Sequence, residues 1–156
     1  MPKPIKPEQL AADSGSSYPA CFHERVLPRH KRALGDAFGL TRIGINQTVL
    51  APGKCSSLRH WHSDEDEFIY VLDGELTLIN DDGERVLTAG MVVGFPAGDG
   101  NAHQLKNAGT QPATYLEISN RSTSDQVEYP DDDLALHGQD ETGQWQFTHK
   151  DGTVWE

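Results

Sequence analysis

The feature that most constrains the fold is a series of short apolar runs separated by turn residues. Between residues 40 and 119, runs rich in β-branched and aromatic side chains alternate with turns built from glycine, asparagine and aspartate. Each run has the length of a strand, and hardly any shows the apolar period of a helix. This pattern is typical of a sandwich or barrel and favours a jelly roll, the double-stranded β-helix. We therefore predict an all-β chain with strands at residues 40–50, 68–72, 75–80, 85–88, 91–95, 102–106 and 114–119.

The run Phe68–Leu72 is apolar at every position, so both of its faces carry apolar side chains. Such a strand is expected to be buried on both sides, against a cavity lining on one and a second layer on the other.

His60, His62 and Glu67 lie close together in this strand-like sequence. Because side chains alternate along a strand, the imidazoles of His60 and His62 point to the same face. A turn then leads to Glu67, which opens the run at 68–72. Antiparallel pairing of that run with the histidine strand would bring the carboxylate beside both imidazoles. The segment therefore supplies most of a metal site, and His103, after a later apolar run, offers a fourth ligand.

Two segments of the chain resemble the two motifs of the cupin superfamily, and the resemblance covers about residues 40–119. The first family motif, a glycine, His-x-His, a glutamate and a glycine, reads here Gly53, His60-Trp61-His62, Glu67 and Gly74. The second, a glycine, Pro-x-Gly, a histidine and an asparagine, reads Gly90, Pro96-Ala97-Gly98, His103 and Asn107. The resemblance implies a cupin-type jelly-roll barrel with a divalent metal ion bound by His60, His62, Glu67 and His103.

Two spacers in these motifs are longer than is usual in the family. Six residues separate Gly53 from His60, and four separate Gly98 from His103. Both spacers are expected in loops or at a strand edge, where extra residues do not move the face on which the ligands lie. The prediction of a metal site is unchanged, but the motifs do not predict the shape of the entrance to the site.

Such a ligand set would leave up to two positions of an octahedral ion for water, substrate or dioxygen. Nitrogen and oxygen donors suit Fe, Mn, Zn, Ni or Co, among which we slightly favour iron or manganese. The resemblance implies a metal-dependent enzyme acting on a small polar metabolite, and isomerisation of a sugar or sugar phosphate is the specific expectation. An Fe(II)-dependent dioxygenase and a non-catalytic small-molecule binding or sensing module are the alternatives, because fold and metal do not choose among them.

Several other side chains are candidates to surround this centre. Alternation predicts that Arg59, next to His60, points away from the ligands, and apolar or aromatic members belong by default to the core. The candidates are Arg42, Arg59, Tyr70, Met91, Phe95, Gln104, Asn107 and Tyr115.

Charge and length exclude several classes of function. The 156 residues suit one domain, and the net charge of −11 argues against binding to a nucleic acid backbone. No apolar run is long enough to span a membrane. Two cysteines and a polar start of the chain favour a reducing cytoplasm.

The chain divides into three parts: an arm and lead-in segment at 1–39, the jelly-roll core at 40–119 and a C-terminal extension at 120–156. The proline-containing segment Met1–Ser17 is expected to be mobile. We expect the extension to dock on the barrel, with residues 144–148 as an added strand that covers a sheet edge or a dimer surface. A twofold homodimer is predicted, with its sheets packed face to face or its arms exchanged, since an isologous contact is the commonest closed assembly.

The one positive cluster of this acidic chain is Arg29–Arg32. It is interpreted either as a solvated face of a short turn or helix or as a clamp for an acidic ligand or an acidic partner subunit.

Overall fold

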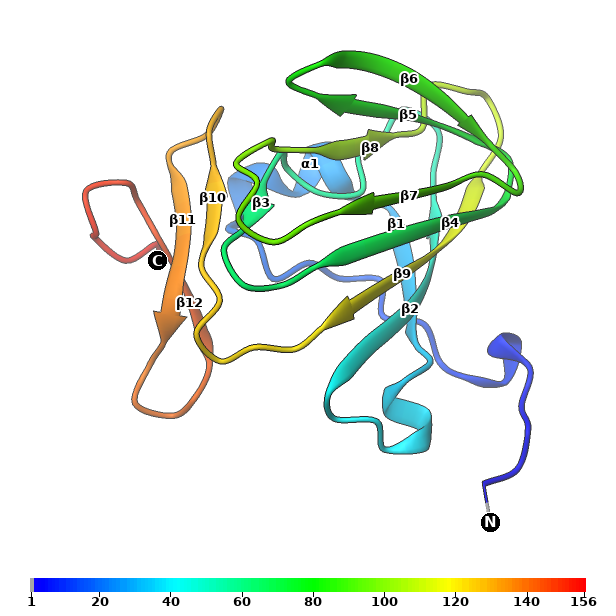
Figure 1. Ribbon diagram of the computed structural model, residues 1–156, viewed down its shortest axis with the longest axis horizontal. Coiled ribbons are helices and arrows are strands. Elements are labelled where there is room, and N and C mark those ends of the chain that lie inside the picture. Colours follow the sequence, from blue (N-terminus) through cyan, green and yellow to red (C-terminus); the bar gives the residue numbers. More distant parts are fainter. Residues whose placement is uncertain (1) are drawn as a thin grey trace.

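The computed structural model describes residues 2–156, which form an all-β jelly roll (Figure 1). Its strands are β1 (Arg29–Ala33), β2 (Ile43–Leu50), β3 (Trp61–His62), β4 (Glu67–Asp73), β5 (Glu75–Asn80), β6 (Gly83–Thr88), β7 (Val92–Phe95), β8 (Gln104–Lys106), β9 (Ala113–Asn120), β10 (Val127–Tyr129), β11 (Leu134–Gln139) and β12 (Trp145–Thr148). The short α-helix α1 spans His23–Val26, and 3-10 helices span Pro7–Gln9, Ala20–Phe22 and Asp36–Phe38. The predicted strands of the core are all present, with small differences at their ends.

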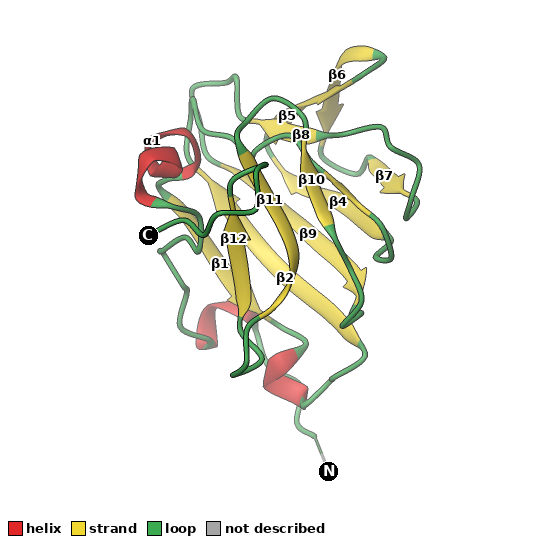
Figure 2. Cartoon of the chain, turned by 90° about the vertical axis from the view of Figure 1, so that its left-hand side faces the viewer, coloured by secondary structure: helices red, strands yellow, loops and turns green. Residues whose placement is uncertain are grey.

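Two layers of strands face each other. One is a five-stranded antiparallel sheet with the order β1-β2-β9-β4-β7. The other combines the sheets β12-β11-β10-β3 and β6-β5-β8, which an isolated bridge between His60 and His103 joins. Figure 2 shows β10, β11 and β12 in front of β1, β2 and β9, so the C-terminal strands close one side of the barrel. His60 and His103, which join the two smaller sheets, line the cavity between the layers.

The core consists of two groups of buried apolar side chains. One group contains Leu50, Val71 and Leu76, and the other contains Leu58 and Leu134. Members of both groups line a single cavity between the layers. The jelly roll therefore holds a hollow centre with a packed core on either side.

The pairing predicted for β4 is wrong. This strand pairs with β7 and β9, whereas the histidine strand β3 pairs with β10. Glu67 therefore reaches the histidines across the interior from the opposite layer, and not along a shared hairpin. The chain does turn between the two segments, but this turn connects one layer to the other and does not form a hairpin.

The prediction that β4 is buried on both faces is also wrong. Ile69 and Val71 are buried, but Phe68, Tyr70 and Leu72 on the other face are 38%, 39% and 40% exposed. No element among residues 2–156 covers this outer face of the sheet. Apolar composition alone could not distinguish a second layer from an uncovered face.

Residues 10–14 of the N-terminal segment, which was expected to be mobile, are hydrogen-bonded to β1, and Met1 lies outside the described residues. Asp13 exchanges two backbone hydrogen bonds of 2.8 Å with Lys31, and the guanidinium of Arg32 donates to the carbonyl of Leu10. The side chains of Ser14 and His30 are also hydrogen-bonded. The segment thus follows the free edge of β1 and satisfies part of it.

The C-terminal residues supply β10, β11 and β12, the last of which is the strand predicted at 144–148. Aromatic contacts hold this region to the lead-in segment: the ring of Phe147 lies 5.5 Å from that of Tyr18, and the ring of Trp155 lies 5.6 Å from that of Phe22. No helix among residues 2–156 is long and apolar enough to cross a membrane.

Candidate metal centre

Backbone pairing places His60 beside His103. The N–H of each residue donates to the carbonyl of the other, at 3.1 and 2.9 Å, so the two form a hydrogen-bonded antiparallel pair with side chains on one face. The longer spacer before His103 contains Gly98 and Gly100, whose positive φ angles of 74° and 73° form the turn. The extra residues therefore lie in a loop, as predicted, and leave His103 opposite His60.

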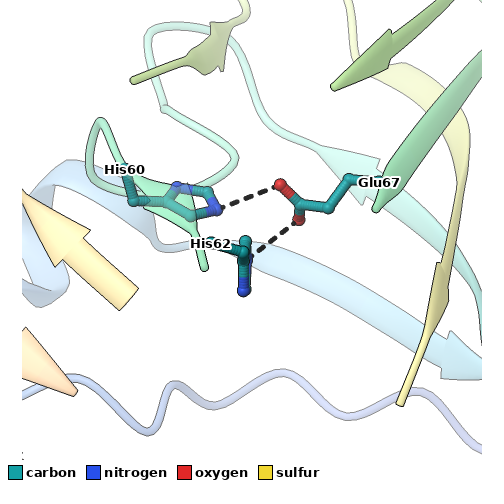
Figure 3. A group of neighbouring side chains, drawn as sticks. All are labelled: His60, His62 and Glu67. Carbon is teal, nitrogen blue, oxygen red and sulfur yellow. Dashed lines mark ion pairs between the residues drawn. The ribbon is translucent and has the colours of Figure 1, made fainter. Parts of the chain in front are cut away.

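His62 joins the same face by strand alternation, and its position is fixed by pairing with Val127 of β10. Glu67 is the first residue of β4 in the opposite sheet, where it pairs with Phe95 of β7 and Ser119 of β9. Figure 3 shows its carboxylate pointing at the rings of His60 and His62. The predicted ligands thus converge from two layers of the barrel.

Three histidine nitrogens surround the Glu67 carboxylate. Its Oε2 lies 3.4 Å from Nε2 of His60 and 2.7 Å from Nε2 of His103, and its Oε1 lies 3.4 Å from Nε2 of His62. One ligand atom each of His60, His62 and Glu67 lies within 4.8 Å of the others. Oε2 is buried yet forms no hydrogen bond, including with the close His103 nitrogen. A buried oxygen without a partner, surrounded by nitrogen donors, fits a divalent cation.

Hydrogen bonds at Nδ1 orient two of the rings. Nδ1 of His60 lies 2.9 Å from the carbonyl of Leu58, and Nδ1 of His62 lies 2.6 Å from Oδ2 of Asp125. Because each acceptor faces Nδ1, the other ring nitrogen, Nε2, is directed at Glu67 and is the atom that can bind an ion. The ring of His103 is instead stacked on that of Phe95, with centroids 3.5 Å apart. Each ring is therefore held before any ion binds.

Asp125 is a site residue that sequence reasoning missed. Its buried side chain also accepts the backbone N–H groups of Asp64 and Glu65, at 2.9 and 3.2 Å. It lies between β9 and β10, far from His62 in the chain, and no local pattern marks it. Only the pairing of β10 with β3 brings it to the histidine.

The charges of the cluster are coupled. Burial favours the neutral forms, but the two carboxylates of Glu67 and Asp125 raise the pKa of His62 to about 9. The pKa of Glu67 is held well below its usual value by the three rings, against the effect of burial. Burial and the neighbouring histidines lower the pKa of His103. Without a metal ion, the protonated form of His62 and the neutral form of His103 are therefore favoured at neutral pH.

The centre opens into a cavity of about 230 Å³. Apolar side chains such as Ile69 and Leu105 line part of it, and Arg29, Lys31 and Glu117 add charge on the side of the five-stranded sheet. The short turn or helix expected for the basic cluster is wrong, because Arg29–Ala33 form the strand β1. The clamp interpretation thus concerns Arg29 and Lys31, which strand alternation places on one face. Glu117 was missed because its inward direction depends on the register of β9.

Two tyrosines add neutral polar groups to the cavity. The hydroxyl of Tyr18 accepts the backbone N–H of Leu58 at 3.3 Å, and its ring lies edge-on to that of Tyr129, with centroids 5.9 Å apart. Burial raises the pKa of both phenols, so both remain protonated at neutral pH.

Of the surrounding candidates, only Phe95 and Tyr115 line the cavity. Arg59 turns outward, as predicted, and forms ion pairs with Asp81 and Asp131. Asn107 is buried but holds the carbonyls of Leu50 and Gln111, a structural role. The remaining candidates lie outside the cavity: Arg42, Tyr70, Met91 and Gln104.

The chain is similar to a known domain family and to solved structures. The model of the cupin domain family matches residues 46–119. A crystal structure described as a sugar phosphate isomerase of the cupin superfamily, from Silicibacter pomeroyi DSS-3, is 38% identical, with a TM-score of 0.91 over 99% of this chain and 97% of that one. A structure described as a putative sugar phosphate isomerase, from Acidithiobacillus ferrooxidans, is 34% identical, with a TM-score of 0.71 over 82% and 80% of the two chains.

A more distant structure shares the fold alone. The polyketide cyclase RemF from Streptomyces resistomycificus is 20% identical, with a TM-score of 0.64 over 77% of this chain and 80% of that one. A search of the curated proteins found no match. The likeness to the Silicibacter protein extends over nearly the whole of both chains, and the chain therefore belongs to the cupin superfamily.

Proposed function

We propose that this protein is a metal-dependent isomerase of a sugar phosphate. The observation that carries the proposal is the 38% identity, over 99% of the chain, to a structure described as a sugar phosphate isomerase. The metal ligands in this proposal are His60, His62, Glu67 and His103, with iron or manganese preferred over zinc, nickel or cobalt. The orphaned Oε2 of Glu67 and the oriented histidine rings support that ligand set.

A bound divalent ion would act as a Lewis acid on a substrate carbonyl or hydroxyl oxygen. Neighbouring side chains hold the histidine ligands in position for this ion. Asp125 fixes the His62 ring through Nδ1, and Phe95 supports the His103 ring by stacking. The protonated hydroxyls of Tyr18 and Tyr129 are available to orient polar groups of the substrate.

Isomerisation of an aldose to a ketose moves a proton between adjacent carbons, which requires a base. Glu117 is the candidate for that role. It lines the cavity and pairs across the sheet with Ile69, two positions along β4 from Glu67. Among residues 2–156 its carboxylate forms no ion pair and no hydrogen bond, so it is free to accept a proton.

Proton NMR in deuterated water tests the function directly. Metal-loaded protein is incubated with a panel of aldose and ketose phosphates, and we expect interconversion of one pair with deuterium incorporated at the carbon that exchanges its proton. A matched anaerobic iron-loaded sample is transferred to an oxygen electrode. Oxygen consumption with no interconversion would favour a dioxygenase, and tight metal-dependent binding with no product would favour a binding or sensing module.

We also propose that two copies pair through the outer face of the five-stranded sheet. Phe68, Tyr70 and Leu72 of β4 are exposed there, and Val92 of β7, paired with Tyr70, is 51% exposed. A contiguous apolar face of this kind is typical of an interaction surface, and a twofold axis would bury it on both copies. Light scattering should give about twice the 17.2 kDa mass of the chain, and Tyr70→Glu should return the monomer mass.

A cytoplasmic location is part of the proposal. Cys21 and Cys55 are both free thiols in the structure, which suits a reducing compartment. Fractionation of cells that produce the protein would test it.

A further inference from the structure

The strand β1 carries two cations into the cavity. Arg29 pairs across the sheet with Leu50 and Lys31 pairs with Thr48, and both of these partners are fully buried on the inner face. Arg29 and Lys31 line the same cavity as the candidate metal ligands. The alternate residues of the strand, among them Arg32, face away from it.

Neither inward cation has a counter-ion among residues 2–156, although the chain has 24 acidic and 13 basic side chains. Arg29 donates from Nη1 to the carbonyl of Ser56, but its Nε is buried with no hydrogen-bond partner. Lys31 is half-buried, and only its backbone is bonded, to Asp13. A buried charge without a partner is unfavourable, so the pair fits a site that an anion completes.

The carboxylates of the cavity do not neutralise this pair. Glu67 and Glu65 lie with the histidines, and Glu65 also accepts the backbone N–H of Ser122. Glu117 lies on β9, between β2 and β4 in the sheet, and forms no ion pair with either cation among the described residues. Two cations against one unpaired carboxylate leave this wall of the cavity positive.

We propose that Arg29 and Lys31 bind the phosphate group of a phosphorylated substrate whose reacting end lies at the metal centre. This inference rests on the proposed function and deepens it. The guanidinium matches two phosphate oxygens at once, and the ammonium adds a point charge. β1 is separated from β4 by β2 and β9, about 14 Å along the sheet at about 4.8 Å per strand. Long inward side chains shorten that span to one that a small sugar phosphate can bridge.

Calorimetric titration with inorganic phosphate at fixed ionic strength tests the subsite. Lys31→Met should weaken phosphate binding by about tenfold or more, and Lys31→Arg should restore it, because charge-assisted hydrogen bonds return. Arg32→Gln is the matched control: it removes one charge from the same strand on the opposite face and should leave binding unchanged. Arg29→Lys tests the second cation with its charge retained, and we expect a smaller loss as the bidentate contact disappears.

A further variant separates this inference from the proposed function. His62→Ala removes a metal ligand and should still bind phosphate like wild type. Loss of phosphate binding in His62→Ala with none in Lys31→Met would place the anion at the metal and overturn the subsite. Absence of phosphate binding in wild type, or Lys31-dependent binding of acetate in its place, would also overturn it. Lys31-dependent phosphate binding with no isomerase activity would contradict only the proposed function.

Discussion

The two walls of the cavity are built in opposite ways. On the histidine wall, two of the rings have an acceptor at Nδ1 and the third is stacked on an aromatic ring, so the donors are fixed in place. On the cation wall, Arg29, Lys31 and Glu117 form no ion pairs among the described residues. Fixed donors suit an ion that stays, whereas unpaired charges suit a ligand that enters and leaves. The comparison predicts that the functions of the walls can be lost separately.

The largest expected effect is on the histidine wall. His62→Ala removes a ligand and one of the two nitrogens on the same strand face, so metal content after dialysis should fall close to zero while the β fold persists. Elemental analysis with circular dichroism measures both. His149→Ala is the control, because His149 stacks on Trp155 outside the cavity and should leave stoichiometry unchanged. Full metal content in His62→Ala and His103→Ala alike would rule out the proposed centre.

On the cation wall, Glu117→Gln should lower activity and leave metal content unchanged. The substitution keeps the shape of the side chain but removes its ability to accept a proton, so kcat should fall by about 10²–10⁴-fold. Metal content should match wild type, since Glu117 is not a ligand in the proposed site. Steady-state kinetics beside elemental analysis separates these quantities, and a variant that keeps wild-type kcat would remove Glu117 from the mechanism.

Asp125→Asn weakens the support of the histidine wall without removing a ligand. Oδ2 receives the His62 Nδ1–H and Oδ1 receives two backbone N–H groups, so an amide NH₂ at either position faces a donor. We expect metal affinity to fall about 10–100-fold. Competition with a metal chelator measures it. The exposed Asp73 forms no side-chain hydrogen bond among residues 2–156, so Asp73→Asn should behave like wild type.

The smallest effect is a proton count. His62 has a pKa of about 9 in the metal-free protein, above its ordinary 6.5, so it is protonated at pH 7. An ion bound at Nε2 displaces that proton, and metal affinity should therefore rise with pH until about pH 9. The same raised pKa stabilises the metal-free fold fully below about pH 6.5, and this contribution is lost as the pH rises through about 9.

Calorimetry at pH 7 in buffers of different ionisation enthalpy gives the number of protons released, which we expect to be about one per ion. Asp125→Asn should release less, because it removes one of the two carboxylates that raise the pKa. Equal proton release from both proteins would show that Asp125 does not set the charge of His62.

Much of the histidine wall could be read from the chain. The spacing of His60, His62 and Glu67, with the second motif that contains His103, identified the residues that the fold brings together. The strands of the core followed from the same local pattern. The predicted strand pairing was wrong, however, because Glu67 lies in the opposite sheet from the histidines. A local pattern does not specify which strands pair.

Sequence by itself determined the all-β class and the candidate ligands, because both depend on local strand patterns and on motif spacing. Only the tertiary structure decided that residues 29–33 form a strand with Arg29 and Lys31 in the cavity, that Asp125 supports His62 and that the outer face of β4 is uncovered. Each of these depends on contacts between residues far apart in the chain. Strand register and layer packing fix such contacts through the burial of the whole core, which no short segment encodes.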